Sequence, residues 1–164
     1  MQSLVSISLG SNINPEQNIR QAVSALQTLF GTLTISPVYK TEAVGFDGDD
    51  FLNLVVSFTT SLTVHEVVSA LKAIEDKIGR DRSQPRFSSR LIDLDLLTYA
   101  DLVLHDAEVQ VPRSEILQNA FVLKPLSDIH AEVLHPELQL SYQQLWEEMR
   151  KKAQRIDYYA MTFE

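Results

Sequence analysis

Cysteine is absent from this chain of 164 residues. Its absence excludes a disulfide framework and a thiolate metal site. Long apolar stretches are absent too, since none approaches the roughly 20 apolar residues of a membrane-spanning helix. Residues 1–10 lack the basic start and the apolar run of a signal peptide. We therefore expect a single cytoplasmic domain over residues 1–164, with no membrane partner.

Positive charge is also scarce, with 14 Lys and Arg against 22 Asp and Glu and a formal net charge of −8. Nucleic-acid-binding proteins are usually basic or carry a broad basic face, so we expect no nucleic-acid partner. Glycine-rich phosphate loops of the GxxxxGK and GxGxxG kinds are missing, so side chains have to bind any phosphates. The histidines lack metal-ligand spacing and are expected at surface or capping positions: His65, His105, His130 and His135.

Apolar periodicity predicts an α+β domain. Strand patterns occupy residues 5–9, 33–39, 51–60 and 91–99. Helical spacing runs from Pro15 to Gly31 and from the capping box at Thr63 to Gly79, with shorter helices expected over 112–119 and after Ser141. Residues 43–50 predict a loop. The order βαββαβ with a helical tail indicates a mainly antiparallel sheet with helices packed on one face.

Two aspartates alternate with apolar residues on the last predicted strand. Asp93 and Asp95 project to one face, while Ile92, Leu94 and Leu96 enter the core. The Cα atoms of the aspartates lie roughly 6–7 Å apart, so their charges repel unless a cation lies beside them. Mg²⁺ is commonly held by one or two carboxylates together with phosphate oxygens. The pair predicts a magnesium site, and the alternative is a solvated face of an edge strand.

Arginine is concentrated directly before this pair. One eleven-residue window contains four of the 14 basic residues, Arg80, Arg82, Arg86 and Arg90. Guanidinium groups bind phosphate oxygens bidentately and stay charged during phosphoryl transfer. Metal-binding carboxylates beside arginine are expected where a triphosphate is neutralised. The combination indicates a transferase that uses ATP, although a salt-bridged surface loop has the same composition.

An aromatic ring and an amide share one face of the predicted strand at 51–60. Phe51 and Asn53 are two residues apart, so a flat heterocycle can stack on the ring while the amide binds its edge. A phenylalanine in a strand is more often a core residue, and that alternative stays open here.

In this order, the segments resemble the 6-hydroxymethyl-7,8-dihydropterin pyrophosphokinase family of the folate pathway. The resemblance runs from Leu9 to about Pro136. Its motifs are Leu9-Gly10-Ser11-Asn12, residues 39–42 followed by Gly45, residues 51–53, Ile74-Glu75, the arginines and aspartates of 80–95, and the Phe-x-Leu-x-Pro-Leu segment at 121–126.

This resemblance implies a ferredoxin-like α+β fold with a mainly antiparallel sheet. It also implies transfer of the β,γ-diphosphoryl group of ATP to the hydroxymethyl group of a dihydropterin, with AMP as the second product. Asp93 and Asp95 would hold two Mg²⁺ ions. Arg80 and Arg90 would stabilise charge during the transfer.

Further residue roles follow from the same resemblance. Contacts to the ATP co-substrate are implied for Glu75, Arg82, Arg86 and Leu96, with Arg82 and Arg86 on a loop that closes over the nucleotide. Arg113 is expected to join them by replacing positive charge that the chain lacks elsewhere. Pterin contacts are implied for Thr41, Val44, Phe51, Asn53 and Phe121, the two phenylalanines enclosing the pterin ring. A monomer is expected, with an oligomer as the alternative.

The chain departs from the family pattern at three places. Members commonly have Trp-Gly/Ala-Pro where Phe87-Ser88-Ser89 stands, Val-Pro-His where Val111-Pro112-Arg113 stands, and an arginine at the position of Asn119. Two alternatives are therefore kept. One is a diverged pterin-binding paralogue with weak or altered transferase activity, and the other is a non-catalytic ferredoxin-like regulatory module.

Overall fold

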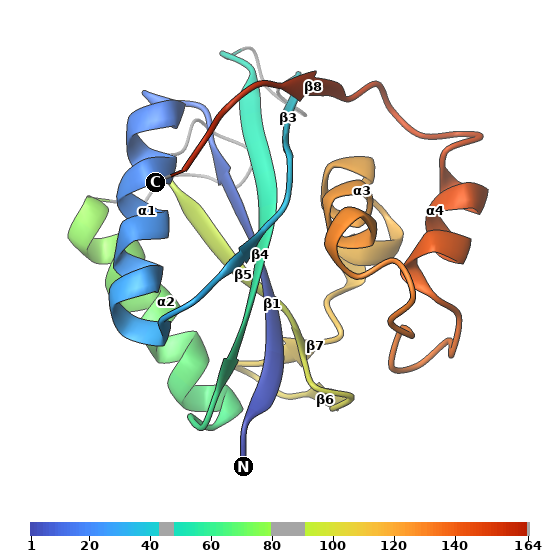
Figure 1. Ribbon diagram of the computed structural model, residues 1–164, viewed down its shortest axis with the longest axis horizontal. Coiled ribbons are helices and arrows are strands. Elements are labelled where there is room, and N and C mark those ends of the chain that lie inside the picture. Colours follow the sequence, from blue (N-terminus) through green and yellow to red (C-terminus); the bar gives the residue numbers. More distant parts are fainter. Residues whose placement is uncertain (43–47, 80–90, 164) are drawn as a thin grey trace.

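The fold is seen in a computed structural model that describes residues 1–42, 48–79 and 91–163 (Figure 1). Its main sheet is antiparallel, with the strand order β5-β1-β4-β3-β8 and with β2 paired to β4. The strands are β1 (Ser3–Ser11), β2 (Thr34–Ile35), β3 (Val38–Thr41), β4 (Phe51–Thr60), β5 (Asp93–Tyr99) and β8 (Asp157–Tyr159). The α+β class and the antiparallel sheet are confirmed, and β5 is an edge strand.

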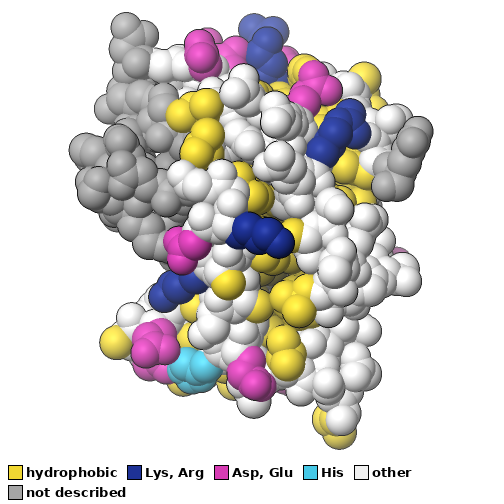
Figure 2. Space-filling view, turned by 90° about the vertical axis from the view of Figure 1, so that its left-hand side faces the viewer, with side chains coloured by type: hydrophobic (Ala, Val, Ile, Leu, Met, Phe, Trp, Pro, Cys, Tyr) yellow, Lys and Arg dark blue, Asp and Glu magenta, His cyan; other side chains and the backbone are white. Residues whose placement is uncertain are grey.

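Two long helices cover one face of this sheet, α1 (Pro15–Phe30) and α2 (Val64–Ile78) (Figure 1). Their predicted apolar stripes are buried, as Ile19 and Leu26 of α1 and Val67 of α2 are fully enclosed. The predicted capping box opens α2, because Thr63 and Glu66 exchange hydrogen bonds. On the outer face of these helices, acidic and basic side chains are interspersed (Figure 2).

The expectation of helices on one face alone was wrong. α3 (Ala120–Ile129) and α4 (Tyr142–Met149) lie on the other side of the sheet (Figure 1). Val55 of β4 and Leu97 of β5 point to that side and are fully buried in a second apolar cluster with Leu123 of α3. Strands that are apolar on both faces need a second covering layer, and α3 provides it.

The segment between β5 and α3 was predicted as a helix over 112–119, which is only partly correct. The chain first forms a hairpin of β6 (Leu104–His105) and β7 (Gln110–Val111), followed by a 3₁₀ turn η1 (Ser114–Leu117). At the end of the hairpin, the Arg113 N–H donates to the Leu97 carbonyl at 2.9 Å. This bond ties the segment to β5 beside the predicted metal site.

The end of the chain returns to the sheet and adds an edge strand that was not predicted. β8 pairs with β3, so that Tyr158 lies opposite Tyr39 and Asp157 opposite Lys40. The Tyr159 hydroxyl donates to the Glu16 carboxylate of α1 at 2.7 Å. Within the described ranges, no helix is long and apolar enough to cross a membrane.

Candidate active site

Strand register aligns the predicted pterin and metal residues on one face of the sheet. Gly10 of β1 pairs with Asp93 of β5 on one side and with Asn53 of β4 on the other. Directly opposed residues share a face, so Asp93, Gly10 and Asn53 form a row, about 10 Å long between the outer Cα atoms at two strand spacings. The next row contains Asp95, Ser8 and Val55. Because Val55 packs with α3, this is the face that α3 partly covers.

Gly10 has a steric role in this row. A Cβ atom placed on it would lie 3.1 Å from Asn53 Oδ1, which is tighter than an ordinary van der Waals contact. The absence of a side chain therefore leaves room for the Asn53 amide between β1 and β4. The sequence motif contained Gly10, but only the strand register shows which neighbour requires it.

Asn53 and Thr41, both predicted to bind the pterin edge, are brought together. Asn53 Nδ2 donates to Thr41 Oγ1 at 2.9 Å, and both residues are buried. The bond fixes which end of the amide faces Thr41 and turns Oδ1 towards Gly10. A pre-oriented buried amide and hydroxyl can bind the polar edge of a heterocycle at little further entropic cost.

The two predicted aromatic residues come from different layers. Phe51 begins β4 on the same face as Asn53, and it is partly buried. Phe121 is the second residue of α3 and packs against the second apolar cluster. The structure thus places one ring on the sheet and the other on the helix that covers it, and their enclosure of a pterin stays a prediction.

Asp93 and Asp95 are half-buried, whereas the alternating Ile92, Leu94 and Leu96 are buried against the α1 and α2 layer. The predicted division of this strand into two faces is therefore confirmed. Leu96 is 5% exposed, so its side chain contributes to the core, and its nucleotide contact stays a prediction.

Glu75, in the last turn of α2, supports the strand between the two aspartates. It is 4% exposed, and its Oε2 accepts a hydrogen bond of 2.8 Å from the Leu94 N–H. A buried carboxylate bound to this amide fixes the strand relative to α2. The resemblance predicted a nucleotide contact for Glu75, and the structure adds this contact to the backbone of the aspartate strand.

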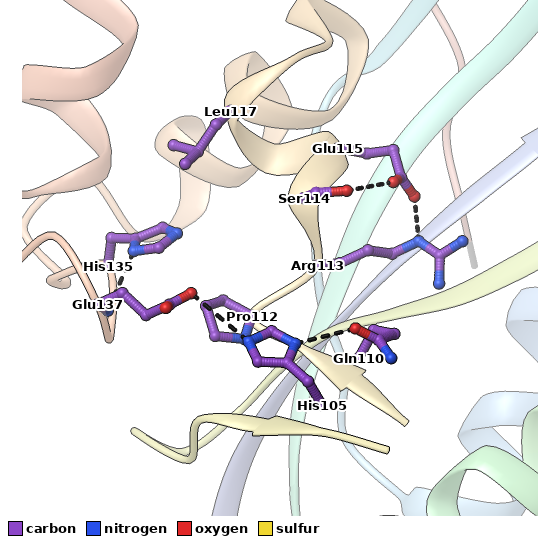
Figure 3. A pocket seen from close by; sticks show the side chains of 9 residues that line it. All are labelled: His105, Gln110, Pro112, Arg113, Ser114, Glu115, Leu117, His135 and Glu137. Carbon is purple, nitrogen blue, oxygen red and sulfur yellow. Dashed lines mark hydrogen bonds and ion pairs between the residues drawn. The ribbon is translucent and has the colours of Figure 1, made fainter. Parts of the chain in front are cut away.

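Arg113 reaches the aspartates from the segment after β7. Its Nη2 lies 3.6 Å from Asp95 Oδ1, and its Nε donates to Glu115. Figure 3 shows the Arg113 guanidinium and the Ser114 hydroxyl directed at the Glu115 carboxylate. Burial alone would lower the pKa of Arg113, but the charges of Asp95, Glu115 and Asp93 outweigh it and raise that pKa.

A cavity of about 250 Å³ lies behind Arg113, between the β6–β7 hairpin, η1 and the loop after α3 (Figure 3). His135 at its wall was expected at a surface or capping position. It is in fact 2% exposed, and its Nδ1 accepts the N–H groups of Glu137 and Leu138. The capping interpretation is therefore right and the surface interpretation wrong, because the ring stabilises a loop from inside.

Several predicted residues lie outside the described ranges, namely Val44, Arg80, Arg82, Arg86 and Arg90. Among the residues that are described, no three His, Asp or Glu side chains gather into a group that could hold a metal. The Asp93 and Asp95 carboxylates suit Mg²⁺ only if water or phosphate oxygens complete its octahedral shell. This donor set fits a metal that arrives with a nucleotide.

Comparison with known proteins gives matches along most of the chain. A family model described as 7,8-dihydro-6-hydroxymethylpterin-pyrophosphokinase (HPPK) matches residues 6–131. A 2-amino-4-hydroxy-6-hydroxymethyldihydropteridine pyrophosphokinase of Bacillus subtilis (strain 168) is 36% identical over 137 residues, covering 81% of this chain and 81% of the relative. One of the same name from Aquifex aeolicus (strain VF5) is 33% identical over 134 residues, covering 80% and 83%.

The fold also resembles solved structures. Wild-type Plasmodium falciparum HPPK-DHPS with pteroate superposes with a TM-score of 0.73 at 13% identity, covering 93% of this chain and 46% of that chain. The same wild-type protein with SDX-DHP gives a TM-score of 0.72 at 13% identity, covering 92% and 45%. The chain thus spans less than half of those proteins, and the likeness establishes the fold of this part alone.

Proposed function

Because the chain belongs to the 7,8-dihydro-6-hydroxymethylpterin-pyrophosphokinase family, we propose that it transfers pyrophosphate from ATP to 6-hydroxymethyl-7,8-dihydropterin. The row of Asp93, Gly10 and Asn53 is the observation that carries the proposal. Its ends are a carboxylate that can hold metal and an amide that can hold the acceptor, on residues whose Cα atoms lie about 10 Å apart at two strand spacings. Over that distance, a pterin bound at Asn53 and a triphosphate bound at the aspartates can bring the hydroxymethyl oxygen and the phosphate groups into contact.

In the proposed reaction, the hydroxymethyl oxygen attacks the β-phosphorus of ATP. The bond between that phosphorus and the α,β-bridging oxygen breaks, and the oxygen leaves with AMP. The proton of the hydroxyl is released, so the products are AMP and the pterin diphosphate. Such transfers depend mainly on positioning and charge stabilisation, and no strong side-chain base is required.

Residues at one end of the row bind the pterin, and residues at the other end bind the metal. Asn53 and Thr41 orient the pterin edge, and Phe51 and Phe121 stack on its faces. Asp93 and Asp95 would hold Mg²⁺, which when bound neutralises phosphate charge and aligns the oxygens of the triphosphate. The resemblance assigns charge stabilisation during transfer to Arg80 and Arg90.

Product analysis tests the proposal. The protein is incubated with MgATP, with and without 6-hydroxymethyl-7,8-dihydropterin, and the nucleotides are separated by chromatography. AMP that forms only with the acceptor supports the proposal, whereas ADP would contradict pyrophosphoryl transfer. Pterin binding without turnover would instead identify a diverged pterin-binding paralogue.

A further inference from the structure

Arg113 is held in place by its backbone and by its side chain. Its backbone N–H donates to the carbonyl of Leu97, two residues beyond Asp95 on β5. Its Nε donates to Glu115, whose other carboxylate oxygen accepts the Ser114 hydroxyl at 2.9 Å. From this position Nη2 lies 3.6 Å from Asp95 Oδ1. Figure 3 shows the contacts of Glu115 with Arg113 and Ser114. The guanidinium is thus directed at the aspartate pair by backbone and side-chain bonds together.

This position matters because two carboxylates one pleat apart repel each other in the absence of a cation. Arg113 brings a permanent positive charge to that pair, since guanidinium does not lose its proton in proteins. The Arg113 and Asp95 side chains are 34% and 41% exposed, so water weakens their attraction but does not abolish it. The chain itself therefore supplies a cation beside its predicted metal site.

We propose that Arg113 is a resident counter-cation of Asp93 and Asp95 and competes with free divalent metal for them. The inference rests on the proposed function, because it takes this pair as the metal site. Without nucleotide, Arg113 offsets the carboxylate charge and weakens metal binding. With ATP, phosphate oxygens would supply further metal ligands, and Glu115 would still hold the Arg113 guanidinium while Asp95 served as a ligand. Arg113 thereby makes firm metal binding depend on the nucleotide.

Binding of Mn²⁺ without nucleotide tests the inference, because Mn²⁺ accepts the same oxygen ligands as Mg²⁺ and free Mn²⁺ is counted by electron paramagnetic resonance. Arg113→Gln should tighten binding by about 3- to 10-fold, the range for a partly screened charge. Arg155→Gln is the matched control, since Arg155 is 87% exposed and pairs with Asp157 on β8. Arg113→Lys keeps the charge and should stay close to the unmodified protein.

Glu115→Gln should change the Mn²⁺ affinity in the opposite direction. It removes the second carboxylate that holds the guanidinium, leaving more of its charge to Asp95, so Mn²⁺ should bind about two- to threefold more weakly. Thermal unfolding without metal gives an independent readout. Arg113→Gln should lower the melting temperature more than Arg155→Gln does. Saturating Mn²⁺ should raise the melting temperature of Arg113→Gln by more than it raises that of Arg155→Gln.

The outcomes separate this inference from the proposed function. If Mn²⁺ binds, is lost in Asp95→Asn, and has the same affinity in Arg113→Gln as in Arg155→Gln, the counter-cation role is overturned while the metal site stands. If no variant binds Mn²⁺, even Arg113→Gln, both the counter-cation role and metal binding by the bare pair are overturned. Formation of AMP, measured separately, decides the reaction itself.

Discussion

The geometry of this site depends on individual atoms, and the missing Cβ atom of Gly10 is one example. It lies between Asp93 and Asn53, at a point where a methyl group would come 3.1 Å from Asn53 Oδ1. Glu75 is a second example, because one buried oxygen holds the amide between the two aspartates. Both residues are expected to act through their neighbours and not by touching the reacting atoms.

Gly10→Ala should weaken pterin binding about tenfold, because Asn53 must move and its bond with Thr41 must lengthen, a cost on the order of 1–3 kcal/mol for overpacking. Fluorescence titration with the pterin measures the affinity. Gly31→Ala is the control, since Gly31 has φ +82° and nothing within 4 Å of a Cβ atom. That change should lower stability and leave pterin affinity unchanged. Equal pterin affinities in the two variants would rule out the role assigned to Gly10.

Glu75→Leu should destabilise the fold by about 1–3 kcal/mol, because it leaves the buried Leu94 N–H without its acceptor. Glu75→Gln retains an oxygen that can accept this bond and should lose less. Urea unfolding of both variants measures the difference in free energy of unfolding. If Glu75→Leu is as stable as Glu75→Gln, the Leu94 bond contributes little.

At the scale of elements, prediction succeeded where the signal was local. Apolar stripes and capping boxes located α1, α2 and the start of α4, where Ser141 and Gln144 exchange bonds as expected. α3 was missed because Pro125 lies inside it and its burial depends on a sheet face formed by distant strands. β8 has three residues, and only its pairing with β3 defines it.

In the candidate site, too, local patterns predicted some features, and others depend on the tertiary structure. Alternation along single strands predicted that Asp93 and Asp95 share a face and that Phe51 and Asn53 share another, and family resemblance pointed to Phe121. No local pattern could bring Gly10 between Asp93 and Asn53, because that juxtaposition needs the register of three strands. The contact of Arg113 with Asp95 likewise depends on the bond between its backbone and β5.

The junction between α3 and β4 makes stability depend on pH. His130 follows α3, and its Nε2 lies 2.9 Å from Ser57 Oγ of β4. Burial lowers the pKa of His130, and it also lowers that of His135, where the charge of Glu137 opposes the effect. Both rings therefore favour the neutral form in the folded state.

The unfolded chain binds these protons more readily, with a histidine pKa of about 6.5. The free energy of unfolding should therefore be at its full value above that pH and fall as the pH drops through the lowered folded values. Urea titrations between pH 7.5 and 5 measure the loss. His130→Gln cannot take up the proton and should lose less stability over this range. An identical pH dependence in both proteins would contradict the effect assigned to His130.

At the scale of the whole molecule, the two faces of the sheet have different roles. α1 and α2 pack the core against one face, and the other face presents the row from Asp93 to Asn53 beside α3. In an acidic protein with a net charge of −8, metal and concentrated arginine can supply local affinity for a triphosphate. In the proposed reaction, the hydroxymethyl oxygen of the pterin therefore attacks the β-phosphorus of ATP on this single face.

Isotope transfer tests this attack on the β-phosphorus most directly. The acceptor pterin is labelled with ¹⁸O in its hydroxymethyl group, reacted with MgATP and the protein, and the products are examined by ³¹P NMR and mass spectrometry. The proposed transfer predicts that all label lies between the methylene carbon and the former β-phosphorus, with unlabelled AMP in equal amount. Label in AMP, or a monophosphate ester of the pterin with ADP, would contradict it.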